Sequence, residues 1–230
     1  MTKSNSNIKN QAYELLKERL INCVYAPGSF LNEAMLAEEL GCSRTPIREA
    51  ISRLEIDQLV KVVPKKGIYV SDISLSDVQQ IFQTRLEIEP MAVRMTAGRI
   101  PEESLYLLRE KFAGDIKDIK NSFRLDTAMH LYIIENCGNR YIIDMMKRVF
   151  EDNTRVIISS KQNQVQIHDA KAEHIEILDA LIDKDVEKAA ELMRVHVESC
   201  RRAALDYFYN NASSEGSSLA AYQDILDKIK

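Results

Sequence analysis

Four polar side chains stand in the middle of apolar helical stripes in the later part of the chain. Asp126 and His130 are four residues apart, and His174 and His196 follow in two later segments. At about 100° per residue, each falls within the arc that carries the aliphatic side chains of its own segment. Buried carboxylates and imidazoles cost several kcal/mol unless something compensates them, so these four groups predict a shared partner.

A divalent cation would compensate all four groups at once. Three imidazoles and one carboxylate suit Zn²⁺, with nickel, manganese and iron as neighbouring choices. Asp126, His130, His174 and His196 are therefore the predicted metal ligands. Cys200, one turn after His196, is a candidate substitute ligand. His168 lies ~120° away from the stripe that carries His174, which argues against it as a ligand.

Other interpretations of these residues stay open. A single histidine of this kind is more often a hydrogen-bonded core residue than a ligand, and the three together could instead contact an organic molecule in a metal-free pocket. A metal-dependent hydrolase or decarboxylase would need a general base beside the metal, as in HExxH, and the sequence contains no such motif. We therefore expect a protein that is not an enzyme.

Helices must position these residues, because apolar side chains follow a helical period from Ser76 onward without strand alternation. The predicted helices cover 76–98 (kinked near Pro90), 102–120, 122–137, 140–160, 168–182 and 185–209. Short connections between them predict antiparallel neighbours in a bundle. The composition of 210–218, NNASSEGSS, predicts a flexible linker, and 219–229 predicts a short terminal helix.

The first 75 residues predict a different module. A first helix over about 8–22 precedes a second one that Asn32 caps and Gly41 ends, and Ser43 then caps a third over 44–57. Two helices joined by a tight glycine-containing turn form a helix-turn-helix. The segments 61–63 and 68–70 flank Pro-Lys-Lys-Gly and predict a two-stranded wing with a basic tip.

The charge distribution supports a nucleic-acid module at this end. Residues 1–75 have a net charge of +1, whereas 76–230 have −5. Residues at the start of a recognition helix reach base edges in the major groove, where arginine pairs with guanine. Ser43, Arg44 and Arg48 hold that position, and Lys65 and Lys66 would approach phosphates from the wing.

The stretch PGSFLNEAMLAEELGCSRTPIREAISRLEIDQLVKVVPKKGIYV resembles the winged helix-turn-helix of the GntR superfamily of bacterial transcription regulators. The resemblance covers about the first third of the chain, and SRTPIREA is its most specific motif. It implies that Arg44, Thr45 and Arg48 contact DNA from the recognition helix and that Gly67 lies at the wing tip.

Three later stretches, DTAMHLYIIENCGN, EHIEILDAL and AAELMRVHV, resemble the FCD ligand-binding domain of FadR-type GntR regulators. In that domain the metal ligands are an Asp and a His four residues apart, followed by two later histidines. The resemblance therefore implies the ligand set Asp126, His130, His174 and His196, which the helical pattern had also selected.

Together these observations predict a mainly α protein. Its expected parts are a winged helix-turn-helix at 7–74, an FCD-like, all-α antiparallel bundle at 78–209 and a tail at 210–230. The expected function is a ligand-responsive regulator, most simply a repressor, which binds a palindromic operator as a homodimer. Its effector would be a small organic acid bound through the metal, with Arg85 as a second anchor.

Location is predicted from what the sequence lacks. No apolar run approaches the ~18 residues of a membrane helix, and the N-terminal MTKSNSNIKN has no signal-peptide core. The four cysteines form no CxxC pair, which favours free thiols in a reducing compartment. We expect a cytoplasmic protein without a membrane partner.

Overall fold

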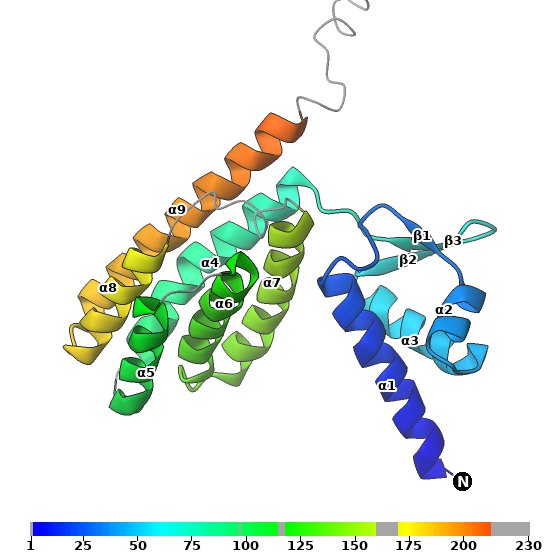
Figure 1. Cartoon of the computed structure of the whole chain (residues 1–230), viewed down its shortest axis with the longest axis horizontal. Coiled ribbons are helices and arrows are strands. Elements are labelled where there is room, and N and C mark those ends of the chain that lie inside the picture. Colours follow the sequence, from blue (N-terminus) through cyan, green and yellow to red (C-terminus); the bar gives the residue numbers. More distant parts are fainter. Residues whose placement is uncertain (1, 97, 115–117, 160–169, 213–230) are drawn as a thin grey trace, which may run out of the picture. The chain divides into compact units, whose positions relative to one another are not determined.

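The computed structural model describes residues 2–96, 98–114, 118–159 and 170–212 (Figure 1). It consists of helices and one small sheet, which confirms the predicted mainly α fold with a winged helix-turn-helix and a helical C-terminal domain. The chain forms two compact units. One contains the described residues up to 74 together with 151–159, and the other contains 75–150 and the described residues after 169. Among the described residues, no helix is both long enough and apolar enough to span a membrane.

The N-terminal unit combines three helices with a three-stranded antiparallel sheet. The helices are α1 (Thr2–Ile21), α2 (Glu33–Glu39) and α3 (Arg44–Ile56). The strands are β1 (Phe30–Leu31), β2 (Val60–Val63) and β3 (Gly67–Val70), in the order β1-β3-β2. α1 begins six residues before the predicted start at 8.

The prediction of a two-stranded wing was incomplete, because β1 adds a third strand. Phe30 pairs with Tyr69 and Leu31 with Ile68 across β3. A two-residue strand is too short to show an alternating pattern, so only its tertiary pairing defines it. Gly67, the first residue of β3, lies beside the end of the paired strand β1, and a Cβ there would stand 2.6 Å from the Leu31 carbonyl oxygen. Its φ of +113° also favours glycine.

Local capping interactions determine where the helices of the helix-turn-helix begin and end. The Asn32 side chain accepts a hydrogen bond of 2.7 Å from the Met35 amide and so caps α2, as predicted. Gly41 follows the helix with φ +60°, and the Cys42 amide donates to the Ala37 carbonyl across it. Ser43 precedes α3 with extended backbone but makes no side-chain cap bond. The turn thus depends on Asn32 and Gly41 more than on Ser43.

The core of this unit lies between α1, α3 and the sheet. Its fully buried side chains come from each of these elements and include Leu16, Leu20, Ile47, Leu54 and Val70. At the edge of the core, the Tyr13 hydroxyl donates to Asp57 at 2.6 Å, and the Arg53 guanidinium stacks over the Tyr13 ring. These contacts hold α1 against α3.

The C-terminal unit is built from helices. They are α4 (Leu75–Thr96), α5 (Glu102–Ala113), α6 (Ile119–Glu135), α7 (Arg140–Ser159), α8 (Lys171–Ile182) and α9 (Val186–Ala212). The last residues of α7, 151–159, group with the N-terminal unit. α4 and α9 pack along one another, and α8 packs against both α5 and α9 (Figure 1). His168 and residues 213–230, including the predicted terminal helix, lie outside the described residues.

Several helix boundaries in the C-terminal unit differ from those the periodicity predicted. α5 ends at Ala113 rather than at 120, and α6 starts at Ile119 rather than at 122. Asp118 determines the second boundary, because its side chain accepts a bond of 3.0 Å from the Lys120 amide. At the other end of the unit, α9 continues to Ala212, beyond the predicted end at 209.

Replacement of the two predicted cap residues should separate their roles. Asn32→Ala removes the bond to Met35 and should lower the free energy of unfolding by about 1 kcal/mol. Ser43→Ala is the matched control and should change it by less than about 0.5 kcal/mol, because no cap bond is lost. Urea titration followed by circular dichroism measures both, and equal losses would contradict this account of the turn.

Candidate metal centre and nucleic-acid interface

Three helices of the C-terminal unit bring four donor atoms together. Asp126 and His130 come from α6, His174 from the first turn of α8, and His196 from the middle of α9. One ligand atom from each lies within 4.8 Å of the others. The three imidazoles are buried, whereas the Asp126 side chain keeps 17% of its exposure. The structure therefore brings together the four residues that the sequence selected, and the group could hold a metal ion.

The donor atoms face one another closely. His174 Nε2 lies 2.9 Å from Asp126 Oδ1, and the Nε2 atoms of His130 and His196 lie 3.7 and 3.9 Å from it. The two latter Nε2 atoms are 3.1 Å apart. Although it is close to Asp126, buried His174 Nε2 has no partner in hydrogen-bond geometry. Four donors thus converge on a common point.

Two carboxylates contact the outer nitrogen atoms of two of these rings. Glu89 of α4 contacts Nδ1 of His130, and Glu173 of α8 lies 2.8 Å from Nδ1 of His196. Arg85, one turn before Glu89, donates to it through Nε at 2.6 Å. Sequence reasoning missed both carboxylates as partners of the imidazoles. The available signal was weak: Arg85 and Glu89 form an i,i+4 pair on the buried face of α4.

The electrostatics of the group follow from these contacts. Burial lowers the pKa of His130, but Glu89 and Asp126 outweigh it and raise that pKa to about 9. Burial opposes ionisation of Asp126, yet the adjacent imidazoles of His130 and His174 hold its pKa well below the usual value. His196 behaves differently, because burial lowers its pKa to about 4. The Asp126 carboxylate is therefore ionised and the His196 ring neutral near pH 7.

This arrangement requires positive charge at its centre. A carboxylate only accepts hydrogen bonds, so Nδ1 of His130 and of His196 must carry the donated proton. Their Nε2 atoms then face each other at 3.1 Å. Without metal, the raised pKa of His130 places a proton between them, and a bound cation would take the place of that proton. Together with Nε2 of His174, which lies 2.9 Å from Asp126 Oδ1, these donors fit a divalent metal ion.

Two further residues lie beside the centre. Cys200 Sγ is 3.7 Å from His196 Nε2, so the candidate substitute ligand touches one of the four predicted ligands. Burial raises the pKa of this thiol. Arg85 is buried and donates a hydrogen bond to Glu89, the carboxylate that contacts Nδ1 of His130. Its side chain is therefore not exposed to solvent.

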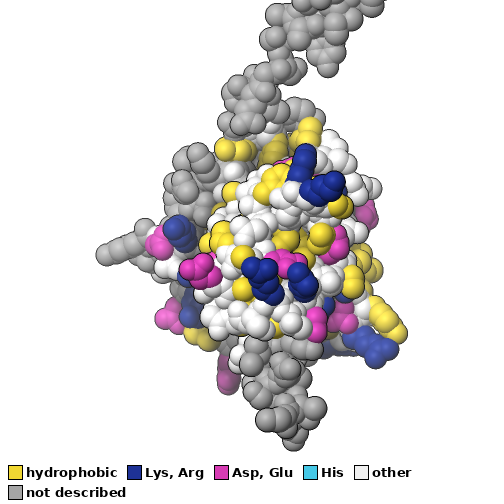
Figure 2. Space-filling view, turned by 90° about the vertical axis from the view of Figure 1, so that its right-hand side faces the viewer, with side chains coloured by type: hydrophobic (Ala, Val, Ile, Leu, Met, Phe, Trp, Pro, Cys, Tyr) yellow, Lys and Arg dark blue, Asp and Glu magenta, His cyan; other side chains and the backbone are white. Residues whose placement is uncertain are grey.

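The predicted DNA-contacting residues lie on the surface of the N-terminal unit. Exposed side chains at the start of α3 and in the turn between β2 and β3 are Ser43, Arg44, Thr45, Arg48, Lys65 and Lys66. Gly67 is half-buried and belongs to β3, so it starts the strand after the turn. Arg48 Nε donates to Glu33 on α2 at 2.8 Å while its side chain stays 65% exposed. In Figure 2, basic groups on this unit stand beside acidic ones.

Two family models match the two parts of the chain. The model described as bacterial regulatory proteins, gntR family, matches residues 8–70, and the FCD domain matches 80–199. The chain belongs to the gntR family and carries an FCD domain. It is therefore a DNA-binding transcription regulator rather than an enzyme.

Two curated relatives match this chain over most of their length and of its own. The chain is 29% identical over 195 residues to the uncharacterized HTH-type transcriptional regulator YdhC of Bacillus subtilis, covering 81% of this chain and 86% of that protein. It is 26% identical over 196 residues to the HTH-type transcriptional repressor RspR of Escherichia coli, covering 83% and 86%. The solved structure of E. coli McbR/YncC matches with a TM-score of 0.73 at 21% identity, covering 88% and 98%.

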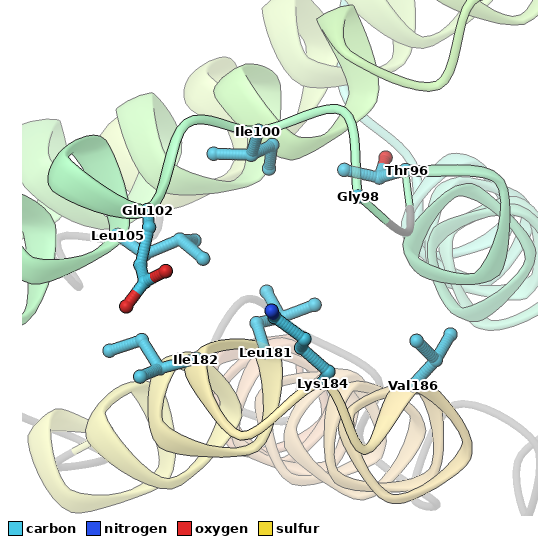
Figure 3. Close-up of a pocket in the computed structure, with 9 residues that line it drawn as sticks. All are labelled: Thr96, Gly98, Ile100, Glu102, Leu105, Leu181, Ile182, Lys184 and Val186. Carbon is cyan, nitrogen blue, oxygen red and sulfur yellow. The ribbon is translucent and has the colours of Figure 1, made fainter.

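A cavity of about 490 Å³ opens at one end of the FCD domain, away from the four donors. It lies between the segment that joins α4 to α5 and the turn from α8 to α9 (Figure 3). Its walls are mainly aliphatic, and Glu102 and Lys184 supply charge at opposite sides. None of the four clustered residues lines it, so the cavity and the candidate metal centre are separate features of this regulator.

Metal binding should stabilise the regulator through the four donors. For wild-type protein stripped with chelator, Zn²⁺ at about 100 times its dissociation constant should add about 2.7 kcal/mol and raise the melting temperature. His174→Ala should lose most of that gain, and His168→Ala, the remaining histidine, should keep it. Calorimetry with and without Zn²⁺ measures the difference. An equal metal-induced rise in His174→Ala would show that this residue is not a ligand.

Proposed function

We propose that this gntR-family protein is a metal-dependent repressor that responds to a small organic acid and binds a palindromic operator as a homodimer. The observation that carries the sensor half is the convergence of Asp126, His130, His174 and His196. The family membership carries the DNA-binding half. RspR, a relative over most of the chain, is described as a repressor, which favours that direction of control.

Zinc is the proposed metal. Three imidazole nitrogen atoms and one carboxylate oxygen form a set that zinc binds readily, and nickel, manganese and iron are alternatives that cellular supply would decide. When bound, the metal would supply Lewis acidity toward a carboxylate ligand. The four side chains would hold it, with the three buried imidazoles on the inner side and the part-exposed Asp126 on the side that solvent can reach.

The proposed effector is a small organic acid, which would reach the metal through its carboxylate. The part-exposed Asp126 marks the side of the centre that solvent can reach, because the three imidazoles are buried. Arg85 is the proposed second anchor, since its guanidinium is bonded to Glu89, the carboxylate that contacts His130. The alternative is a metal-free pocket in which the same imidazoles bind an organic ligand directly.

In the proposed DNA complex, the start of α3 would enter the major groove. Arg44, Thr45 and Arg48 would contact base edges, with Ser43 close to the same groove. Lys65 and Lys66 would contact phosphates from the turn that precedes Gly67. Two copies of the module would then meet the two halves of a palindromic operator, as the symmetry of a homodimer requires.

Replacement of Arg48 tests the placement of the recognition helix. Arg48→Ala should weaken specific binding by about 1–3 kcal/mol, a loss of roughly 5- to 150-fold in affinity, while the FCD domain stays folded. Gel-shift titration on a duplex selected from random sequence by the wild-type protein measures this. Arg202→Ala, an exposed arginine on α9, is the matched control and should bind like wild type. Wild-type affinity in Arg48→Ala would contradict the placement.

The metal content of the purified protein separates the proposed sensor from its metal-free alternative. Protein prepared without chelator should contain about one divalent ion per chain by elemental analysis, because four converging donors suit a single ion. Asp126→Ala should contain much less. Wild-type protein with no bound metal, even after incubation with Zn²⁺, would favour the metal-free pocket.

A further inference from the structure

We propose that Glu89 and Glu173 are positioning residues of the metal centre. Each accepts the Nδ1 proton of one imidazole and thereby turns the Nε2 atom of that ring toward the common point. This inference rests on the metal site proposed above, and it assigns a role to two residues outside the four donors.

The same contact pattern occurs twice, on two histidines from different helices. Glu89 contacts Nδ1 of His130, and Glu173 lies 2.8 Å from Nδ1 of His196. A neutral imidazole has one N–H group, and the acceptor beside it decides which nitrogen carries the proton. A carboxylate at Nδ1 therefore leaves the Nε2 lone pair available as a ligand.

Both carboxylates reach across a helix–helix contact. Glu89 belongs to α4 and its histidine to α6, while Glu173 belongs to α8 and its histidine to α9. The orientation of each ring is thus restrained by a neighbouring helix as well as by its own backbone. His174 is held in another way, since its ring packs on Phe112 with centroids 4.5 Å apart.

The two carboxylates differ in what else depends on them. Glu89 is buried and also accepts from Arg85 at 2.6 Å, so its loss would leave a buried guanidinium without that carboxylate. The side chain of Glu173 is 29% exposed, so its charge can be removed with less damage to folding. Glu173 is for this reason the sharper position for a test.

Zinc affinity of the full chain provides the first measurement. Protein stripped of metal is titrated with Zn²⁺ against a chromophoric chelator, comparing wild type with Glu173→Gln and Glu89→Gln. Each variant should bind Zn²⁺ about 10- to 100-fold more weakly, which is the usual effect of losing such an outer partner. Glu176→Gln on α8 and Glu87→Gln on α4 are exposed matched controls and should bind like wild type.

The imidazole tautomer provides a second measurement that general destabilisation would not change. In metal-free wild type with ¹⁵N-labelled histidine, NMR should show the proton of His196 on Nδ1. In Glu173→Leu, which has no acceptor, the population should shift toward the Nε2–H form. If Glu89→Gln fails to fold by circular dichroism, the two Glu173 variants decide the matter.

The outcomes separate this inference from the site on which it rests. Zinc binding by wild type with weakened binding and a shifted tautomer in the Glu173 variants would support it. Wild-type affinity in Glu173→Gln with an unchanged tautomer in Glu173→Leu would overturn it and leave the metal site intact. No zinc binding by wild type would overturn the proposed metal site itself.

Discussion

The burial of three imidazoles around one carboxylate is the constraint on which the C-terminal unit depends. Groups of this kind are normally stable inside a protein only when each lone pair and each proton has a partner. Here the outer nitrogen atoms of His130 and His196 meet carboxylates, while the inner ones face each other and Asp126. The helices therefore pack around a centre that favours positive charge, and a metal ion is the simplest permanent source of it.

This constraint explains why the four donors could be found from the sequence. Each sits within the apolar arc of its own helix, and a 3.6-residue period shows that position without any knowledge of the fold. The positions of Glu89 and Glu173 relative to the rings could not be found in this way. Glu173 contacts a ring on α9, so its role emerges only when α8 and α9 pack together.

The same division between local and tertiary information holds in the N-terminal unit. The cap at Asn32 and the left-handed Gly41 are set by short-range chemistry, and both were predicted. The strand β1 was missed because its two residues become a strand only by pairing with β3. Gly67 illustrates how the two kinds of information differ. The sequence suggests a glycine at the tip of the wing, whereas in the structure a side chain at this position would clash with the Leu31 carbonyl oxygen.

The position of Glu89 along the chain links the proposed metal centre to the winged module. α4 begins at Leu75, shortly after β3 ends at Val70, and it also carries the carboxylate that contacts His130. A ligand that moved His130 would therefore act on the helix that follows the winged module in the chain. By reciprocity, DNA would change the affinity for that ligand by the same factor, and a tenfold effect needs only about 1.4 kcal/mol of coupling. One rearranged hydrogen bond between charged groups is large enough to supply that energy.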